Sequence, residues 1–232
     1  MCDRVPLVRT CVTVPPSFAH LIAHTDVLCQ ADLSLTSNRY LGVDCEGTDA
    51  ERWTNYGGSG AQLVQVSSKR VVIVEALSCR REEVGGGLSD ELRMIIQDAT
   101  IAKVFCDQKG DIQALNAEMS PNYPNNSGAP GSVANTVDVQ SLMKIGKQKL
   151  GLAQVVSASS DGLVFSKRSI KKERWWRLRT VSQMVNASGF VQYSAADAWG
   201  TWLCYELINH PVPVSEGSDE ERYSRLLEQI TS

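Results

Sequence analysis

The segment YLGVDCEGT, residues 40–48, carries the pattern that decides the fold. Apolar and β-branched residues lead into two acids, which is typical of a core strand, here Tyr40–Glu46. Because side chains alternate between the two faces of a strand, Asp44 and Glu46 share one face and Cys45 points to the opposite side. The segment therefore predicts two carboxylates near the end of one strand, with Cys45 as buried packing.

Three more polar residues can join these carboxylates. Asp111, in KVFCDQKGDIQAL (103–115), is expected to begin a helix directly after a buried strand. That junction lies near the carboxyl end of the sheet, where α/β proteins place their ligands. Tyr193 and Asp197, in YSAADAWGTWL (193–203), are four residues apart and so share one helix face. A strand, a junction and a late helix can thus converge on one point.

Several carboxylates at one point repel one another, so they make physical sense together only if a cation neutralises them. Oxygen ligands of this kind suit hard divalent ions such as Mg²⁺ or Mn²⁺. Two such ions are a recurrent device for cutting phosphodiester bonds, and a neighbouring tyrosine can hold the attacking water. The acids and the tyrosine therefore predict phosphodiester cleavage with two divalent metal ions.

The rest of the chain predicts an α/β fold, a mixed sheet flanked by helices. Residues 62–68 alternate and residues 71–76 are apolar, so the two segments are expected to form an antiparallel hairpin. Helices and strands then alternate, which favours three antiparallel strands followed by parallel ones. The other expected elements are a strand at 10–14, a helix opened by Ser17, strands at 103–106 and 135–139, and helices at 89–99, 111–119, 140–145, 150–157 and 193–207.

Length and composition fit one ordinary globular domain. The chain has 232 residues, of which 43% are hydrophobic and 21% charged. We expect a single domain over 1–232, with a core at about 36–210. An N-terminal strand-helix extension is expected at 1–35 and a C-terminal helix at 216–232.

Cysteine usage and apolar patterning bear on the compartment. The seven cysteines contain no CxxC pair, which favours a reducing compartment and argues against a disulfide framework or a structural zinc site. No apolar run approaches the roughly 18–20 residues of a membrane span, and the N-terminus lacks the apolar region of a secretory signal. The expectation is an intracellular protein of the nucleus or cytoplasm, with an organelle as an open alternative, and no membrane partner.

A basic stretch offers a route for a nucleic acid. KRSIKKERWWRLR, residues 167–179, holds seven basic residues, one acid and two tryptophans. Charge and stacking of this kind can guide a single strand, although the tryptophans equally suit a core. Candidate substrate contacts are the basic residues Lys171, Lys172, Arg174 and Arg177, together with Gly47 and Thr48 beside the terminal sugar.

The chain resembles the DEDD superfamily of 3′–5′ exonucleases, in its tyrosine-bearing (DEDDy) subclass. The matching segments are LGVDCEGT, QLVQVSS, AKVFCDQKGDIQAL, TVDVQSLM and YSAADAWGTWL, in the family's order over about residues 40–208. The family includes ribonuclease D, exosome-associated nucleases and the Werner exonuclease domain. VDCEG is most similar to the branch that contains Egalitarian and the exonuclease 3′–5′ domain-containing proteins. The resemblance implies a ribonuclease H-like fold and 3′–5′ exonuclease activity.

The resemblance also implies a role for each site residue. Asp44, Glu46, Asp111 and Asp197 would be the metal carboxylates, and Tyr193 would orient the attacking water. Asp138, in TVDVQ, matches a position that caps the next helix and stands outside the site.

Two departures from the family pattern affect the surroundings of these residues. Cys106 and Asp107 stand where relatives often have histidine or asparagine-like residues. The link between Arg179 and Tyr193 is longer than usual, and Thr180 replaces a proline.

The expected function is a metal-dependent exoribonuclease that hydrolyses single-stranded RNA from the 3′ end to nucleoside monophosphates. It would use Mg²⁺ or Mn²⁺, and a protein partner in an RNA-processing complex is expected to contribute to substrate choice. Two alternatives stay open on sequence alone: a non-catalytic RNA-binding or scaffold subunit, and a DNA-directed 3′–5′ exonuclease.

Overall fold

The computed structural model describes residues 11–12, 19–22, 39–46, 63–69, 72–75, 77, 88–119, 131–143, 149–160, 164–165, 181–187, 190–211, 221, 224, 225 and 228. All statements about the fold concern these residues. Within them, no helix combines the length and the apolar character that crossing a membrane requires.

The centre of the fold is a mixed six-stranded sheet with the order β2-β5-β4-β3-β6-β7. β3 pairs antiparallel with β4, and β4 pairs antiparallel with β5. β6 and β7 continue from β3 in parallel. The expected arrangement of three antiparallel strands followed by parallel ones is therefore confirmed. The strands of this sheet are β2 (Ala19–Ile22), β3 (Tyr40–Glu46), β4 (Leu63–Ser67), β5 (Val72–Glu75), β6 (Ala102–Phe105) and β7 (Thr136–Asp138).

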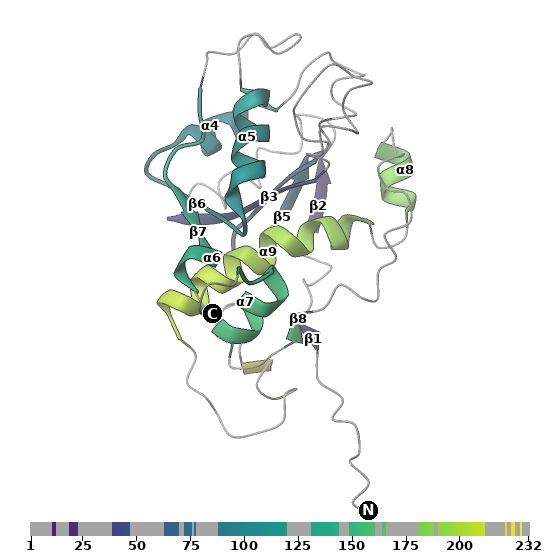
Figure 1. The fold of residues 1–232 in the computed structure, drawn as a ribbon. Helices are drawn as coiled ribbons and strands as arrows, with labels where there is room; N and C mark the ends of the chain where they lie inside the picture. Colours follow the sequence, from purple (N-terminus) through teal and green to yellow (C-terminus); the bar gives the residue numbers. More distant parts are fainter. Residues whose placement is uncertain are drawn as a thin grey trace, which may run out of the picture.

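Helices cover both faces of the sheet (Figure 1). One face carries α4 and α5, and the other carries α9 with α6 and α7 beside it. The helices are α4 (Asp90–Gln97), α5 (Gln108–Glu118), α6 (Val139–Leu142), α7 (Leu152–Ser159), α8 (Val181–Asn186) and α9 (Phe190–Asn209).

Strand alternation produces two separate apolar cores. Leu41, Val43 and Cys45 of β3 lie in the core shared with α4 and α5. The opposite face of the sheet packs against α9, where Trp199 and Trp202 are almost fully buried. The acids of β3 therefore face the α9 side, and the burial of Cys45, predicted from the sequence, is confirmed.

The first helix expected from the sequence is wrong in part. Residues Ala19–Ile22, expected inside a helix opened by Ser17, form the strand β2, which pairs parallel with β5. The segment AHLI, which is apolar except for His20, extends the sheet at its edge, so tertiary pairing overrides the helical pattern. The rest of the expected helix lies outside the described residues.

A small second sheet joins distant parts of the chain. β1 (Cys11–Val12) pairs parallel with β8 (Val164–Phe165). β1 falls within the strand expected at 10–14. Most of the C-terminal helix expected at 216–232 lies outside the described residues; Glu221, Ser224, Arg225 and Glu228 are helical. The expectation of a single domain stays a prediction.

Candidate active site

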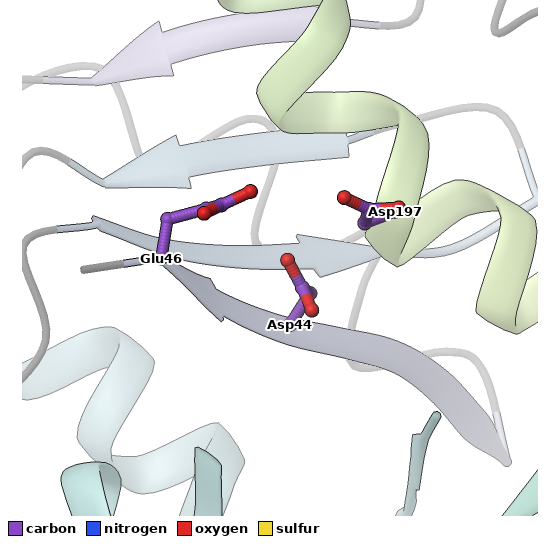
Figure 2. Close-up of side chains that lie close together, drawn as sticks. All are labelled: Asp44, Glu46 and Asp197. Atoms are coloured by element: carbon purple, nitrogen blue, oxygen red, sulfur yellow. The ribbon is translucent and has the colours of Figure 1, made fainter. Parts of the chain in front are cut away.

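Three carboxylates meet on the α9 side of the sheet. Asp44, Glu46 and Asp197 each offer an oxygen within 4.8 Å of the others. Figure 2 shows Asp44 and Glu46 on β3 and Asp197 on α9, with the three carboxylates turned toward one another. The two acids of β3 are half-buried and Asp197 is buried, so solvent does little to screen their repulsion.

Close packing of α9 on β3 brings the third acid to the other two. A Cβ atom at Gly42 would lie 2.6 Å from the backbone nitrogen of Trp202 and 2.8 Å from its Cβ. Only glycine therefore allows α9 to approach β3 this closely. Since Gly42 and Asp44 share one face of β3, the same approach that excludes a side chain at position 42 carries Asp197 down to Asp44.

Asp111, the fourth acid predicted for the site, is not part of the trio that meets within 4.8 Å. It is buried, with 9% of its surface exposed. Burial, together with the charges of Glu46, Asp107 and Asp197, raises the pKa of its carboxyl to about 8. The carboxyl of Asp111 therefore interacts electrostatically with two members of the trio, Glu46 and Asp197.

The local structure around Asp111 differs from the expectation in one respect. The helix α5 begins at Gln108, so Asp111 lies within its first turn and does not begin it. The reason is the turn at Asp107, whose backbone is left-handed with φ 68° and ψ 59°. That residue follows β6 by two positions, and the helix starts directly after it, three residues earlier than the sequence pattern indicates.

Tyr193 lies on α9 one turn before Asp197, on the same helix face. It is buried, with 8% of its surface exposed. Its place on the helix that carries Asp197 keeps it a candidate site residue.

Gln65 is a site neighbour that the sequence analysis missed. It lies opposite Asp44 in the β3–β4 pair, so the two side chains share one face. The residue is fully buried, and neither polar atom of its amide has a hydrogen-bond partner among the described residues. The signal that could have found it is its place in QLVQVSS: a polar residue in the middle of an otherwise buried hairpin strand.

The donor set fits a divalent cation. Three carboxylates converge from two elements, and hard oxygen ligands of this kind suit Mg²⁺ or Mn²⁺. Their mutual repulsion, together with the raised pKa of Asp111, shows an electrostatic cost that a cation would remove. The unpartnered amide of Gln65 on the same face gives a further polar group for water around such an ion.

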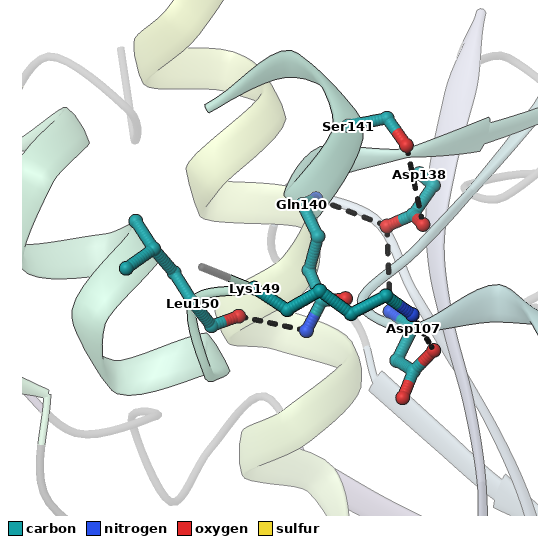
Figure 3. Close-up of polar contacts among 6 residues, drawn as sticks. All are labelled: Asp107, Asp138, Gln140, Ser141, Lys149 and Leu150. Atoms are coloured by element: carbon teal, nitrogen blue, oxygen red, sulfur yellow. Dashed lines mark hydrogen bonds and ion pairs between the residues drawn. The ribbon is translucent and has the colours of Figure 1, made fainter. Parts of the chain in front are cut away.

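Cys106 connects the site to a second polar junction. Burial, together with the charges of Asp138, Asp44, Asp197 and Asp107, raises the pKa of its thiol to about 12. The thiol thus lies among carboxylates from both places and is held in its neutral form. Figure 3 shows the neighbouring junction, in which Asp138, Asp107 and Lys149 are linked by hydrogen bonds and an ion pair.

The candidate substrate contacts all lie outside the described residues. These are Gly47, Thr48, Lys171, Lys172, Arg174 and Arg177.

The chain is similar to a known protein family over most of its length. The family model described as "3′-5′ exonuclease" matches residues 22–210, which is most of the chain. A search of curated protein sequences finds no match.

Solved structures similar to this fold include an EXO domain and two RNase D proteins. The Aedes aegypti Nibbler EXO domain superposes with a TM-score of 0.59 at 16% identity, over 94% of this chain and 99% of that one. Trypanosoma brucei RNase D, in complex with RNA U12, gives 0.60 at 18% identity, over 92% and 70%. Escherichia coli RNase D, described as an exoribonuclease involved in structured RNA processing, gives 0.54 at 15% identity, over 92% and 51%. At these identities the likeness shows the ribonuclease H-like exonuclease fold.

Proposed function

Because the chain belongs to the 3′–5′ exonuclease family, whose model spans residues 22–210, we propose that it degrades single-stranded RNA from the 3′ end to nucleoside monophosphates. The observation that carries the proposal is the meeting of Asp44, Glu46 and Asp197 within 4.8 Å. The family depends on divalent metal ions, and these acids are the ligands such ions prefer.

Each residue of the site has a role in the proposed reaction. Asp44, Glu46, Asp111 and Asp197 would hold two divalent ions. Bound there, the ions would supply an activated water and stabilise the leaving 3′ oxygen. The four acids would act by holding the ions, because carboxylates alone repel a phosphodiester.

Tyr193 would orient the water, which would make the chain a member of the tyrosine-bearing subclass. Its position one turn before Asp197 supports this role, because residues four apart share one face of a helix. Orientation needs only a hydrogen bond from the phenol, because acidity comes from the metal.

RNA is the proposed polymer because two similar structures are ribonucleases by name, one of them in complex with RNA. The test is incubation of the purified protein with 5′-labelled single-stranded RNA or DNA in Mg²⁺, Mn²⁺ or EDTA. A metal-dependent ladder that shortens the RNA from its 3′ end is the expected result. Faster shortening of DNA would make the enzyme DNA-directed, and tight binding without shortening would make it a scaffold.

A matched pair of variants ties the activity to the site. Asp44→Asn keeps the shape of the side chain and removes one charge from the trio, so activity is expected to fall about 10²–10³-fold, the range for loss of one electrostatic group. Asp90→Asn removes an equal charge from an exposed position on α4, on the other face of the sheet, and is expected to keep full activity. Equal activity of the two variants would contradict the proposed site.

A further inference from the structure

Asp107 has an unusual backbone at the junction between β6 and α5. Its φ of 68° and ψ of 59° lie in the left-handed region, which side chains other than glycine adopt at a conformational cost. The residue is the N-cap of α5, yet its side chain makes no hydrogen bond to that helix. Something outside the junction must therefore hold this conformation.

Two contacts from the next part of the chain hold Asp107. Its backbone N–H donates to Oδ1 of Asp138 over 3.3 Å, and its own Oδ1 accepts from Nζ of Lys149 over 3.1 Å. Both partners lie beside it in Figure 3. The Lys149 ion pair is largely exposed to solvent and so contributes little. The contact with Asp138 involves the main-chain N–H of Asp107, so it is the one that bears directly on the backbone conformation.

Asp138 is itself well anchored. It ends β7 and is the N-cap of α6, where its Oδ1 accepts from the backbone N–H of Gln140 over 3.0 Å. The side chain of Gln140 in turn donates to the carbonyl of Leu150 over 2.7 Å, which connects the start of α6 to the segment before α7. One carboxylate oxygen thus serves two backbone donors, one from each junction.

This link acts on the acid that α5 brings to the site. β6 lies between β3 and β7, and α5 begins one residue after Asp107. Asp111 lies in the first turn of that helix, which contacts β3, the strand that carries Asp44 and Glu46. A change in φ at position 107 would rotate the start of α5 and move the carboxyl of Asp111.

We propose that Asp138 is a positioning residue for the metal site: it holds Asp107 in its left-handed conformation and so places Asp111 against the trio. The inference rests on the proposed function, since it needs Asp111 to help bind the cation. It goes beyond a capping role, because Asp138 acts across two strand-to-helix junctions.

Two substitutions at one position separate positioning from capping. Asp138→Ser keeps a good cap for α6 but has a shorter side chain, which cannot reach the N–H of Asp107 as well. Asp138→Asn keeps an acceptor oxygen at the same reach. Both remove the same charge, so a difference between them reports on the contact alone.

The measurement is Mn²⁺ affinity by titration calorimetry, with exonuclease rate against Mn²⁺ concentration as the second readout. Asp138→Ser is expected to weaken Mn²⁺ binding about tenfold to a hundredfold, the range for residues that orient metal ligands. Asp138→Asn is expected to stay within about threefold of the unaltered protein, because it keeps the acceptor.

A second substitution tests the role of the strained backbone. Glycine adopts the left-handed region freely, so Asp107→Gly should need no external tether. Adding Asp138→Ser to Asp107→Gly is expected to weaken Mn²⁺ binding by a much smaller factor than in the natural background.

The outcomes are distinct. Equal Mn²⁺ affinity of Asp138→Ser and Asp138→Asn would overturn the inference, as would an equal loss in both backgrounds at position 107. If the unaltered protein binds no Mn²⁺, the proposed function fails, and the inference that rests on it fails with it.

Discussion

Asp44 and Gln65 lie directly opposite each other in the antiparallel pair of β3 and β4. Their side chains share the face that α9 covers, where such pairs have Cβ atoms about 4.5–5.5 Å apart. Gln65 is fully buried and its amide has no partner among the described residues. An unpartnered buried polar group costs about 1–3 kcal/mol. A neutral amide kept beside a carboxylate at such a cost is typical of a functional position.

The substitution Gln65→Met is therefore expected to raise the stability of the protein and to lower its activity. Methionine has a similar volume and no unpaired amide, so the free energy of unfolding of the metal-free protein is expected to rise by about 1 kcal/mol. Exonuclease activity is expected to fall about tenfold or more, since the polar group next to Asp44 is lost. Thermal unfolding in EDTA and the ladder assay measure the two effects.

Gln97→Met is the matched control. Nε2 of Gln97 also lacks a partner among the described residues, but the residue ends α4 on the opposite face of the sheet. Its substitution is expected to leave activity unchanged. A Gln65→Met variant as active as this control would show that the buried amide has no part in the reaction.

The substitution Gly42→Ala is expected to lower both the stability of the protein and its affinity for Mn²⁺. The added Cβ would collide with backbone atoms of Ala198 and Trp202, and backbone cannot move aside cheaply. Overpacking of this kind costs about 1–3 kcal/mol or more. Because α9 carries Asp197, its displacement should also weaken Mn²⁺ binding. Urea unfolding and Mn²⁺ titration test the prediction.

A second glycine provides the comparison for this substitution. A Cβ at Gly151 would meet nothing nearer than Oε1 of Gln154, at 3.9 Å. Its φ of −71° suits any residue, so Gly151→Ala is expected to leave both measurements almost unchanged. The prediction for Gly42 is wrong if both variants behave alike.

Much of the site could be predicted because it follows from local periodicity. Alternation along β3 places Asp44 and Glu46 together, and helical spacing places Tyr193 above Asp197. These rules need no knowledge of tertiary structure. The strand order could be predicted for the same reason, since a hairpin followed by alternating helices and strands leaves few arrangements.

The remaining features depend on contacts between distant segments. Nothing in the local sequence shows that Asp107 adopts a left-handed backbone. Nor does it show that the backbone N–H of Asp107 donates to Asp138, 31 positions further along the chain. Gln65 becomes notable only once the register sets it opposite Asp44. Likewise, Ala19–Ile22 is a strand because β5 offers it an edge, which a helical pattern read in isolation does not show.

The raised pKa of Asp111 predicts how stability of the metal-free protein depends on pH. Its folded-state pKa is about 8, against about 3.9 for an unperturbed aspartate. The folded state therefore holds the proton more tightly than the unfolded state does. The contribution of this group is most favourable below pH 4 and is lost as pH rises toward 8. In EDTA, stability is expected to decline across this window.

Asp111→Asn isolates that contribution, since asparagine keeps the shape and does not titrate. Between pH 5.5 and 8 its unfolding temperature in EDTA is expected to vary less with pH than that of the unaltered protein. Mn²⁺ should oppose the decline, because ligands bind the ionised form and metal affinity rises with pH. Parallel pH profiles of the two proteins in EDTA would contradict the shifted pKa.

Two substitutions on one face of α9, Tyr193→Phe and Asp197→Asn, are expected to cause different defects in catalysis and in metal binding. The phenol oxygen orients water in the proposed mechanism and holds no metal, so Tyr193→Phe should lower kcat about 10²–10⁴-fold while Mn²⁺ affinity stays within about twofold. Asp197→Asn removes a charge from the trio itself, so it should lower both kcat and Mn²⁺ affinity. Single-turnover rates at saturating Mn²⁺, with calorimetry for affinity, separate the two. Loss of Mn²⁺ binding in Tyr193→Phe would instead make the tyrosine a structural support of the carboxylates, because a group that only orients water leaves the metal ligands untouched.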